Sequence, residues 1–188
     1  MQVFDFDNTL YYGESAVDFA VWMIRHNRRI LLWLPRIFWN LLKYKLCLVD
    51  RESIEQPVNE FLRLLIRDEA ELRRTVARFW ETHRRFLNQR VIAKIRPGDV
   101  IITAGPSFLL EPIHAELKGV RMICSEVDLQ RRRVVYINMH DNKARRFREE
   151  FGQTPIARFY TDSFNDRAMM EIARRVYLVK RDRIKRIK

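Results

Sequence analysis

The second half of the chain alternates short apolar runs with amphipathic stretches, and this alternation constrains the fold more than any other feature. Four runs are short, apolar and rich in β-branched or aromatic residues, as strands are: DVIITA, VRMICSEV, IARFYTD and VYLV. Three stretches have apolar residues at helical spacing: PSFLLEPIHAEL, KARRFREEFG and FNDRAMMEIARR. RRRVVYINM is expected to form a hairpin strand. Strands that alternate with helices predict an α/β fold, with a parallel sheet covered on both faces.

Residues 14–88 have a different texture. They contain no glycine, and apolar residues recur every three to four positions, which predicts a series of helices. Pro35 and Pro57 are expected to kink or divide two of them. The first residues of the chain read as a strand that belongs with the later strands. We therefore interpret residues 14–88 as a helical insertion into an α/β core formed by residues 1–13 plus 89–188.

Polar groups follow four of the predicted strands. They are Asp5 and Asp7, then Thr103, Ala104 and Gly105, then Lys143, and finally Asp162 and Asp166. Ligands of open α/β sheets bind outside the carboxyl ends of the strands, so these groups are expected to converge on one crevice. Two acids spaced like Asp5 and Asp7 are costly to bury unless positive charge lies beside them. Lys143 or a bound cation would supply that charge.

The stretches DFDNT, IITAGPS, NMHDNK and TDSFND occur in this order, each at a predicted strand end. They resemble the four motifs of the haloacid dehalogenase superfamily, and ITAGPSFLLEPI and INMHDNKARR are most similar to its phosphoserine phosphatase-like branch. The resemblance implies a Rossmann-like parallel sheet core with an inserted α-helical cap directly after the first motif. Asn8, Met139 and Asp141 depart from the usual pattern, but none of them replaces a group with a chemical task.

The resemblance also implies a Mg²⁺-dependent phosphatase that hydrolyses phosphomonoesters through an aspartyl-phosphate. Asp5 would be the nucleophile and Asp7 the general acid and base, while Lys143 would stabilise the phosphoryl charge. Thr103 and the N–H groups of Ala104 and Gly105 would bind the phosphoryl oxygens. Asp5, the backbone carbonyl of Asp7 and Asp162 would hold the Mg²⁺, with Asp166 orienting Lys143 or a metal-bound water.

Glu14 and Ser15 allow two interpretations. In the phosphoserine phosphatases an acid at this offset from the first motif helps to recognise the ammonium group of the substrate, and Glu14 preserves such an acid. Alternatively, Glu14 or Ser15 simply caps the first helix of the insertion.

The insertion also leaves the substrate class open. Residues 19–49 contain no acid, and Trp33 and Trp39 fall beside Arg36 and Lys43, away from the main apolar stripe. One interpretation is a helical hairpin buried in its own cap, above a small soluble phosphomonoester. The other is an interfacial helix that docks on an anionic membrane and presents a lipid phosphate, assisted by the basic end KRDRIKRIK. The apolar run is too short and too interrupted to span a bilayer.

The net charge of +12 favours anionic partners without choosing among them. A basic nucleic-acid-binding module is the competing class, but the sequence contains no recognisable nucleic-acid motif. Cys47 and Cys124 are isolated, which indicates reduced thiols in a cytoplasmic protein. No secretory leader fits before Asp5. We therefore expect a cytoplasmic enzyme. The alternative is a cytoplasmic enzyme that contacts the inner membrane face peripherally.

Overall fold

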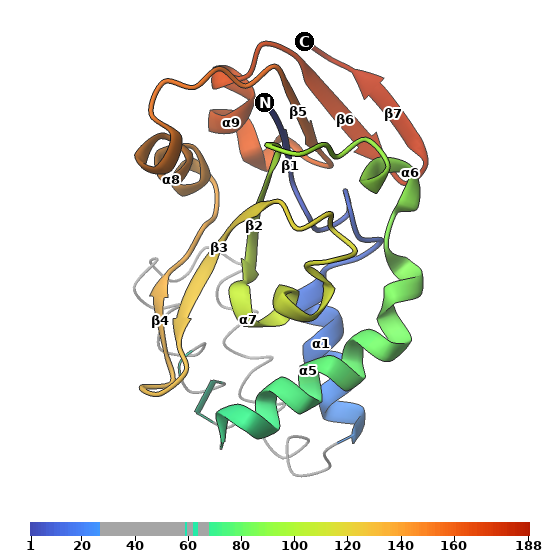
Figure 1. Cartoon of the computed structure of the whole chain (residues 1–188), viewed down its shortest axis with the longest axis vertical. Helices are drawn as coiled ribbons and strands as arrows, with labels where there is room; N and C mark the ends of the chain where they lie inside the picture. The colour runs from blue at the N-terminus through green and yellow to red at the C-terminus, as the bar shows by residue number, and fades with distance from the viewer. Residues whose placement is uncertain (27–58, 60–61, 64–67) are drawn as a thin grey trace, which may run out of the picture.

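The computed structural model of the protein describes residues 1–26, 59, 62–63 and 68–188, which contain a seven-stranded sheet with helices around it (Figure 1). The described strands are β1 (Gln2–Phe4), β2 (Val100–Pro106), β3 (Arg121–Asp128), β4 (Arg133–Tyr136), β5 (Arg158–Thr161), β6 (Val176–Lys180) and β7 (Arg183–Arg186). The described α-helices are α1 (Ser15–His26), α5 (Glu69–His83), α6 (Gln89–Ile92), α7 (Ser107–Leu110), α8 (Asp141–Phe151) and α9 (Arg167–Ile172). Short 3₁₀ turns form at η1 (Arg84–Phe86), η2 (Glu111–Ile113) and η3 (Phe164–Asp166).

The strands stand in the order β4-β3-β2-β1-β5-β6-β7. The five central strands are parallel, as the sequence predicts, whereas β4 and β7 pair antiparallel with their neighbours. The sheet is therefore mixed, with a hairpin at each edge. The hairpin predicted for RRRVVYINM is confirmed by β4. VYLV, which we expected to form the last strand of the chain, is followed by β7, whose residues Arg183 to Arg186 pair with Lys180 to Tyr177.

Helices cover both faces of the sheet, as predicted. Successive side chains of a strand point to opposite faces, so Val3 and Phe4 enter different cores. Val3 lies in a cluster with Phe147 of α8 and Met169 of α9. Phe4 lies in the other cluster with Trp80 of α5 and with residues of α7. These two cores hold the central strands rigidly and fix where their carboxyl ends lie.

Two predicted helices differ from the structure in length. PSFLLEPIHAEL forms the short helix α7 and then η2, because Pro112 has no N–H with which to continue an α-helix. FNDRAMMEIARR begins as η3 and ends its α-helical part at Ile172. The helix predicted at KARRFREEFG is confirmed by α8, which ends at Gly152 with a positive φ of 59°.

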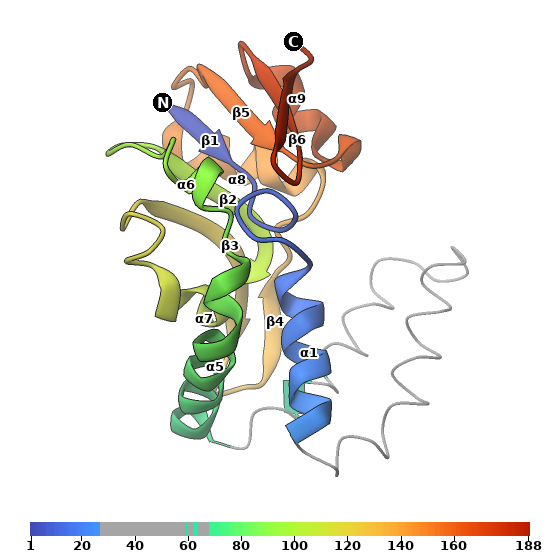
Figure 2. The same ribbon diagram turned by 90° about the vertical axis from the view of Figure 1, so that its right-hand side faces the viewer.

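Helices α1 and α5 extend side by side beyond the carboxyl ends of the central strands (Figure 2). Phe19 of α1 packs edge-on against Phe79 of α5, with ring centroids 5.3 Å apart. The helices predicted between residues 27 and 67, including the tryptophan-bearing stretch, lie outside the described residues except for three positions. No helix in the described part of the chain is long and apolar enough to cross a membrane.

Candidate active site

The site begins where β1 ends. The Asp5 backbone N–H donates to the Tyr160 carbonyl of β5 at 2.8 Å, so Asp5 still lies in line with the sheet. The chain then turns sharply, because the Phe6 carbonyl accepts from the N–H groups of Leu10 at 2.8 Å and Tyr11 at 3.0 Å. Asp5 is only 5% exposed, and its side chain reaches the lysine of the third motif.

Lys143 is the centre of the site. It comes from the first turn of α8, is 5% exposed, and donates from Nζ to Asp5 Oδ1 at 2.7 Å and to Asp166 Oδ2 at 3.0 Å. Asp166 Oδ2 also accepts from the Thr161 hydroxyl at 2.9 Å. Burying charged groups is costly unless they are paired and hydrogen-bonded, and here each one is. The geometry thus joins three of the residues predicted from the sequence and places Asp166 directly on Lys143.

The acids of the site are hard to ionise together. Burial raises the pKa of Asp5 to about 8 against the opposing effect of Lys143, and the carboxylate of Asp166 raises it further. Burial also raises the pKa of Asp7 and of Asp162 above their ordinary values. Although burial lowers it, the carboxylates of Asp5 and Asp166 raise the pKa of Lys143, which therefore stays an ammonium. One lysine thus faces an excess of carboxyl groups.

Asp7 is held by the start of α1. Its Oδ1 accepts from the Ser15 backbone N–H at 2.7 Å, and this hydrogen bond opposes the rise in the pKa of Asp7 that burial causes. The Ser15 hydroxyl is fully buried and has no hydrogen-bond partner among the described residues. A Cβ placed on Gly105 would lie 3.7 Å from that hydroxyl and 3.3 Å from Thr103 Oγ1. Gly105 therefore keeps open a narrow space between two hydroxyl groups.

The end of β2 is fixed by residues whose role the sequence did not reveal. The Gly105 N–H donates to Thr103 Oγ1 at 2.9 Å, so the hydroxyl proton of Thr103 is left to donate elsewhere. The amide of Asn138 donates to the Thr103 carbonyl at 2.9 Å, and the Ser125 hydroxyl donates to the Ala104 carbonyl at 2.7 Å. Asn138 and Ser125 are positioning residues. A lone buried Asn or Ser at a strand end carries no pattern by which sequence reasoning could have found it.

Glu14 lies at the rim of the site. Its Oε1 accepts from the Asn8 side-chain amide at 2.6 Å. The Glu14 backbone carbonyl accepts from the Asp18 N–H at 2.8 Å, but no described hydrogen bond joins its side chain to the N–H groups of the first turn of α1. Burial, and then the nearby carboxylates of Asp7 and Asp162, raise the pKa of Glu14. Asn8 has a φ of 55°, a left-handed conformation that glycine adopts freely and that Asn tolerates better than most residues.

The donor set is compatible with a hard divalent cation. Asp162, half-buried after β5, lies close enough for its charge to act on both Asp7 and Glu14. The described residues contain no group of three or more His, Cys, Asp or Glu side chains arranged to hold a metal. The set expected from the sequence needs only two such side chains, Asp5 and Asp162, because its third donor is the Asp7 carbonyl. Oxygen donors with excess negative charge are what Mg²⁺ prefers.

Comparison with protein families assigns nearly the whole chain to one family. The family profile described as haloacid dehalogenase-like hydrolase matches residues 3–171, which include every motif of the site. The chain belongs to this family of hydrolases. No curated protein matches it.

Solved structures agree on the fold. A protein with unknown function from Bordetella pertussis Tohama I is similar with a TM-score of 0.77 and 22% identity, covering 94% of this chain and 87% of that chain. Cytosolic 5'-nucleotidase IIIB bound to cytidine is similar with a TM-score of 0.55 and 14% identity, over 93% and 69% of the two chains. Phosphoserine phosphatase in its apo form has a TM-score of 0.51 and 14% identity, over 93% and 82%. At these identities the likeness shows a shared Rossmann-like fold.

Proposed function

We propose that this hydrolase is a phosphatase that cleaves phosphomonoesters through an aspartyl-phosphate on Asp5. The observation that supports this best is the buried ion-pair cluster in which Lys143 bridges Asp5 and Asp166. Lys143 occupies only Oδ1 of Asp5, so Oδ2 is the oxygen that attacks phosphorus in line. The new P–O bond forms on Asp5 as the bond to the leaving oxygen breaks.

Charge repulsion is the main barrier that the site must overcome. A carboxylate and a phosphate oxygen at about 4 Å repel by about 4 kcal/mol at an effective dielectric constant of about 20. Lys143 offsets part of this repulsion, since its ammonium lies against the nucleophile. Thr103 Oγ1 donates its free proton to a phosphoryl oxygen, and the absence of a side chain on Gly105 lets the backbone approach closely.

Asp7 moves the protons of both half-reactions. Its raised pKa supports a protonated carboxyl that gives its proton to the leaving oxygen. The resulting carboxylate then takes a proton from the water that hydrolyses the acyl-phosphate on Asp5. The Ser15 N–H on Oδ1 stabilises the carboxylate form between these steps and leaves Oδ2 for the proton.

We further propose that Mg²⁺ completes the site, held by Asp5, the carbonyl of Asp7 and Asp162. When bound, the ion would neutralise the excess of carboxylate charge and polarise a phosphoryl oxygen. Asp166 keeps Lys143 turned toward Asp5 through the bonds described above. This assignment is supported by the number of buried acids that share a single lysine.

We propose that residues 14–88 form a cap that selects the substrate. The chain leaves the core after Tyr12 and returns at Phe86, where the Tyr12 N–H donates to the Phe86 carbonyl at 2.8 Å. Glu14 and the unpartnered Ser15 hydroxyl lie where this segment starts. Glu14 suits a substrate with an ammonium group near its phosphate, and the Ser15 hydroxyl suits a phosphoryl or leaving oxygen.

The test of the function is hydrolysis of p-nitrophenyl phosphate with Mg²⁺ by the purified protein. Asp5→Asn and Asp7→Asn should each abolish turnover. Asp68→Asn is the matched control. Asp68 caps helix α5 away from the site, and Asn caps a helix as well as Asp does. Near-wild-type turnover by Asp5→Asn would refute the nucleophile assignment.

The substrate class is tested with a panel of soluble and lipid phosphomonoesters, each with and without an ammonium group. Glu14→Gln should raise KM for the ammonium-bearing substrates and leave KM for p-nitrophenyl phosphate unchanged. An equal change for both kinds of substrate would show that Glu14 does not contact the ammonium group.

A further inference from the structure

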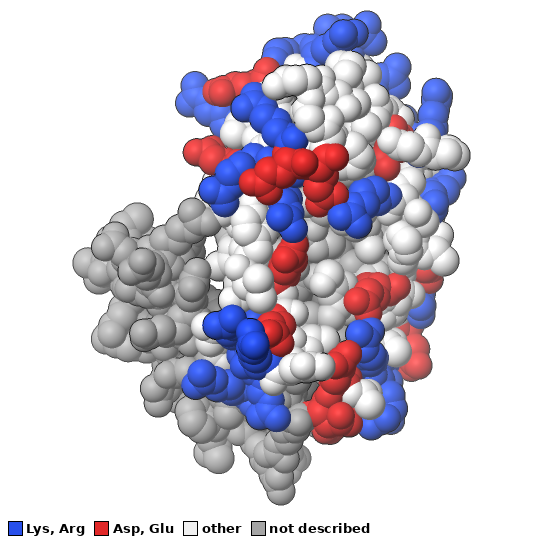
Figure 3. Space-filling view, turned by 60° about the vertical axis from the view of Figure 1, so that its left-hand side comes forward, with Lys and Arg blue, Asp and Glu red and all other residues white. Residues whose placement is uncertain are grey.

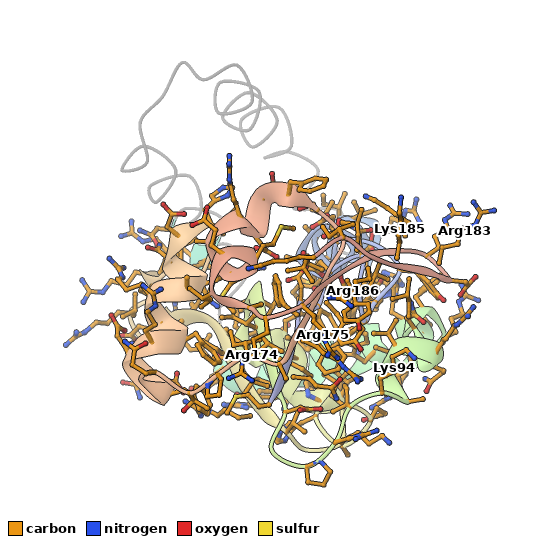
Figure 4. The ribbon with its side chains drawn as sticks, turned by 90° about the horizontal axis from the view of Figure 1, so that it is seen from above. Lys94, Arg174, Arg175, Arg183, Lys185 and Arg186 are labelled. Carbon is orange, nitrogen blue, oxygen red and sulfur yellow. The ribbon has the colours of Figure 1, made fainter. Side chains whose placement is uncertain are left out.

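A group of basic side chains lies at the amino end of the sheet and along its β7 edge. This basic end consists of Lys94, Arg174, Arg175, Arg183, Lys185 and Arg186, all exposed (Figure 4). Arg174 and Arg175 directly precede β6, and Lys94 lies before β2, so these three mark the amino ends of parallel strands whose carboxyl ends carry the site. The other three come from the edge strand β7, along which Arg183 pairs with Lys180 at the carboxyl end of β6 and Arg186 pairs with Tyr177 near its amino end.

No aspartate or glutamate in the described part of the chain forms an ion pair with these six bases, whereas Arg73, Arg84 and Arg121 each pair with a glutamate. Arg186 Nε donates to the Lys188 backbone oxygen at 2.8 Å. The contrast is visible on the face that carries α8, where basic and acidic side chains interleave (Figure 3).

The acids near the basic end are engaged elsewhere. Asp99 is buried, and its carboxylate accepts from the side chain and the backbone N–H of Gln2. Asp182, in the turn between β6 and β7, accepts from the Tyr12 hydroxyl at 2.6 Å. Glu171 pairs with Arg167. Asp99 and Asp182 keep their charge because these donors are neutral, but neither forms an ion pair with a base of the basic end.

The pairing of β7 with β6 fixes the positions of three of the basic residues. Ile184 turns inward and packs against the core, so Arg183 and Lys185 on either side of it turn outward. Ile187 follows at the chain end and is 40% exposed, although its N–H is bonded to the Val176 carbonyl at 2.9 Å. Arg186 lies on the same side of β7 as Ile184, so the bases of this edge strand project from both of its sides.

We propose that the basic end docks the enzyme on an anionic lipid bilayer. A bilayer surface is fluid and planar, so it matches bases at any spacing. Nucleic acid is recognised by an element that enters a groove or by aromatic rings that stack on bases. The described helices at this end, α6 and α9, are four and six residues long, and the exposed large apolar side chain there is the aliphatic Ile187. Charge with one aliphatic contact fits a lipid surface better.

Docking in this orientation goes beyond the phosphatase function and does not depend on it. Lys94, Arg174, Arg175 and Arg186 lie toward the amino ends of the parallel strands, so a bilayer against these four bases leaves the crevice at the carboxyl ends open to water. The membrane would then set where the enzyme works, and the substrate would reach the site from the aqueous side.

The proposal is tested by co-sedimentation of the full chain with vesicles of three parts phosphatidylcholine to one part phosphatidylglycerol, and with pure phosphatidylcholine. The wild type should bind the anionic vesicles only, and more weakly as salt is raised. Each base near such a surface contributes about fivefold in binding, so Arg174→Gln, Arg183→Gln and Lys185→Gln together should weaken binding about a hundredfold.

The control variant removes the same number of charges from elsewhere, by Arg78→Gln, Lys118→Gln and Arg148→Gln. It should bind almost as well as the wild type, and both variants should keep the wild-type melting temperature and p-nitrophenyl phosphate turnover. Equal losses in the two variants would overturn the proposal, because net charge alone would then explain binding. So would undiminished binding by the first variant, or wild-type binding to duplex DNA that exceeds vesicle binding in the same buffer.

Discussion

Replacing Lys143 with methionine tests the charge arrangement of the site through stability, independently of catalysis. The variant keeps the volume of the side chain and removes the ammonium that bridges Asp5 and Asp166. Removing one partner of a buried ion pair costs about 3–5 kcal/mol, because the other charge is left without a partner. For a chain of this length each kcal/mol lowers Tm by about 2–4 °C, so we expect a loss of about 6–20 °C at pH 8.

The pH dependence has a definite sign. Burial already raises the pKa of Asp5 to about 8 in the wild type, and the loss of Lys143, which lowers it, raises the pKa of Asp5 further above its unfolded value. A folded-state pKa that is raised gives stability that is present at low pH and lost as pH rises through that pKa. The Tm of the variant should therefore approach that of the wild type near pH 4, close to the unfolded-state pKa of Asp5, and fall away toward pH 8.

The assay is thermal unfolding followed by circular dichroism, in EDTA so that no metal replaces the lost charge. Arg121→Met is the matched control, since it removes an exposed ion pair with Glu150 that is worth about 1 kcal/mol or less. If Lys143→Met melts like the wild type at pH 8, with an unchanged pH profile, Lys143 does not lie between two buried acids.

Three further outcomes follow from the site. EDTA should silence the enzyme and Mg²⁺ restore it, and beryllium fluoride should inhibit by occupying Asp5 as a phosphoryl mimic; full activity after exhaustive metal removal would rule out the metal assignment. Because burial raises the pKa of Asp7, kcat should stay high at pH values above the usual pKa of an aspartic acid, and it should decline as the pH rises through the raised pKa. A decline that is already complete near pH 4 would contradict a protonated Asp7. Gly105→Ala should raise KM for p-nitrophenyl phosphate severalfold without lowering Tm by more than a few degrees, because the new Cβ stands 3.3 Å from Thr103 Oγ1; an unchanged KM would show that this space does not receive the phosphoryl group.

The central fold could be predicted from the sequence because its signals are local. Each parallel strand is a buried apolar run, and each carboxyl end carries a polar residue that a sheet must bring to one edge. The strand β7 could not be predicted in this way. Its only apolar residue is Ile184, and what makes it a strand is the pairing of Arg183 and Arg186 with a neighbour that supplies the hydrogen bonds. A strand whose stability comes from its partner leaves little trace in its own composition.

The same distinction applies to the site. Asp5, Asp7 and Lys143 carry charges at recognisable spacings, so the sequence predicts that they meet. The direct contact of Asp166 with Lys143 depends on the conformation of η3. The hydrogen bond from Asn138 to the Thr103 carbonyl depends on how the segment after β4 packs against the end of β2. Such contacts between distant segments are set by packing, which no single stretch of sequence reveals.

The point where the inserted segment leaves and rejoins the core has a consequence for how such enzymes diversify. Tyr11 and Leu87 form an antiparallel bridge, and the Asn88 N–H donates to the Leu10 carbonyl at 2.8 Å. The two ends of the segment are thus fixed beside each other by hydrogen bonds that belong to the core. Whatever lies between them can lengthen, shorten or be exchanged at little entropic cost, because the closure of that loop is already determined. A segment of different length or sequence could therefore be joined to the core at Tyr11 and Leu87 without changing the hydrogen bonds that close the loop.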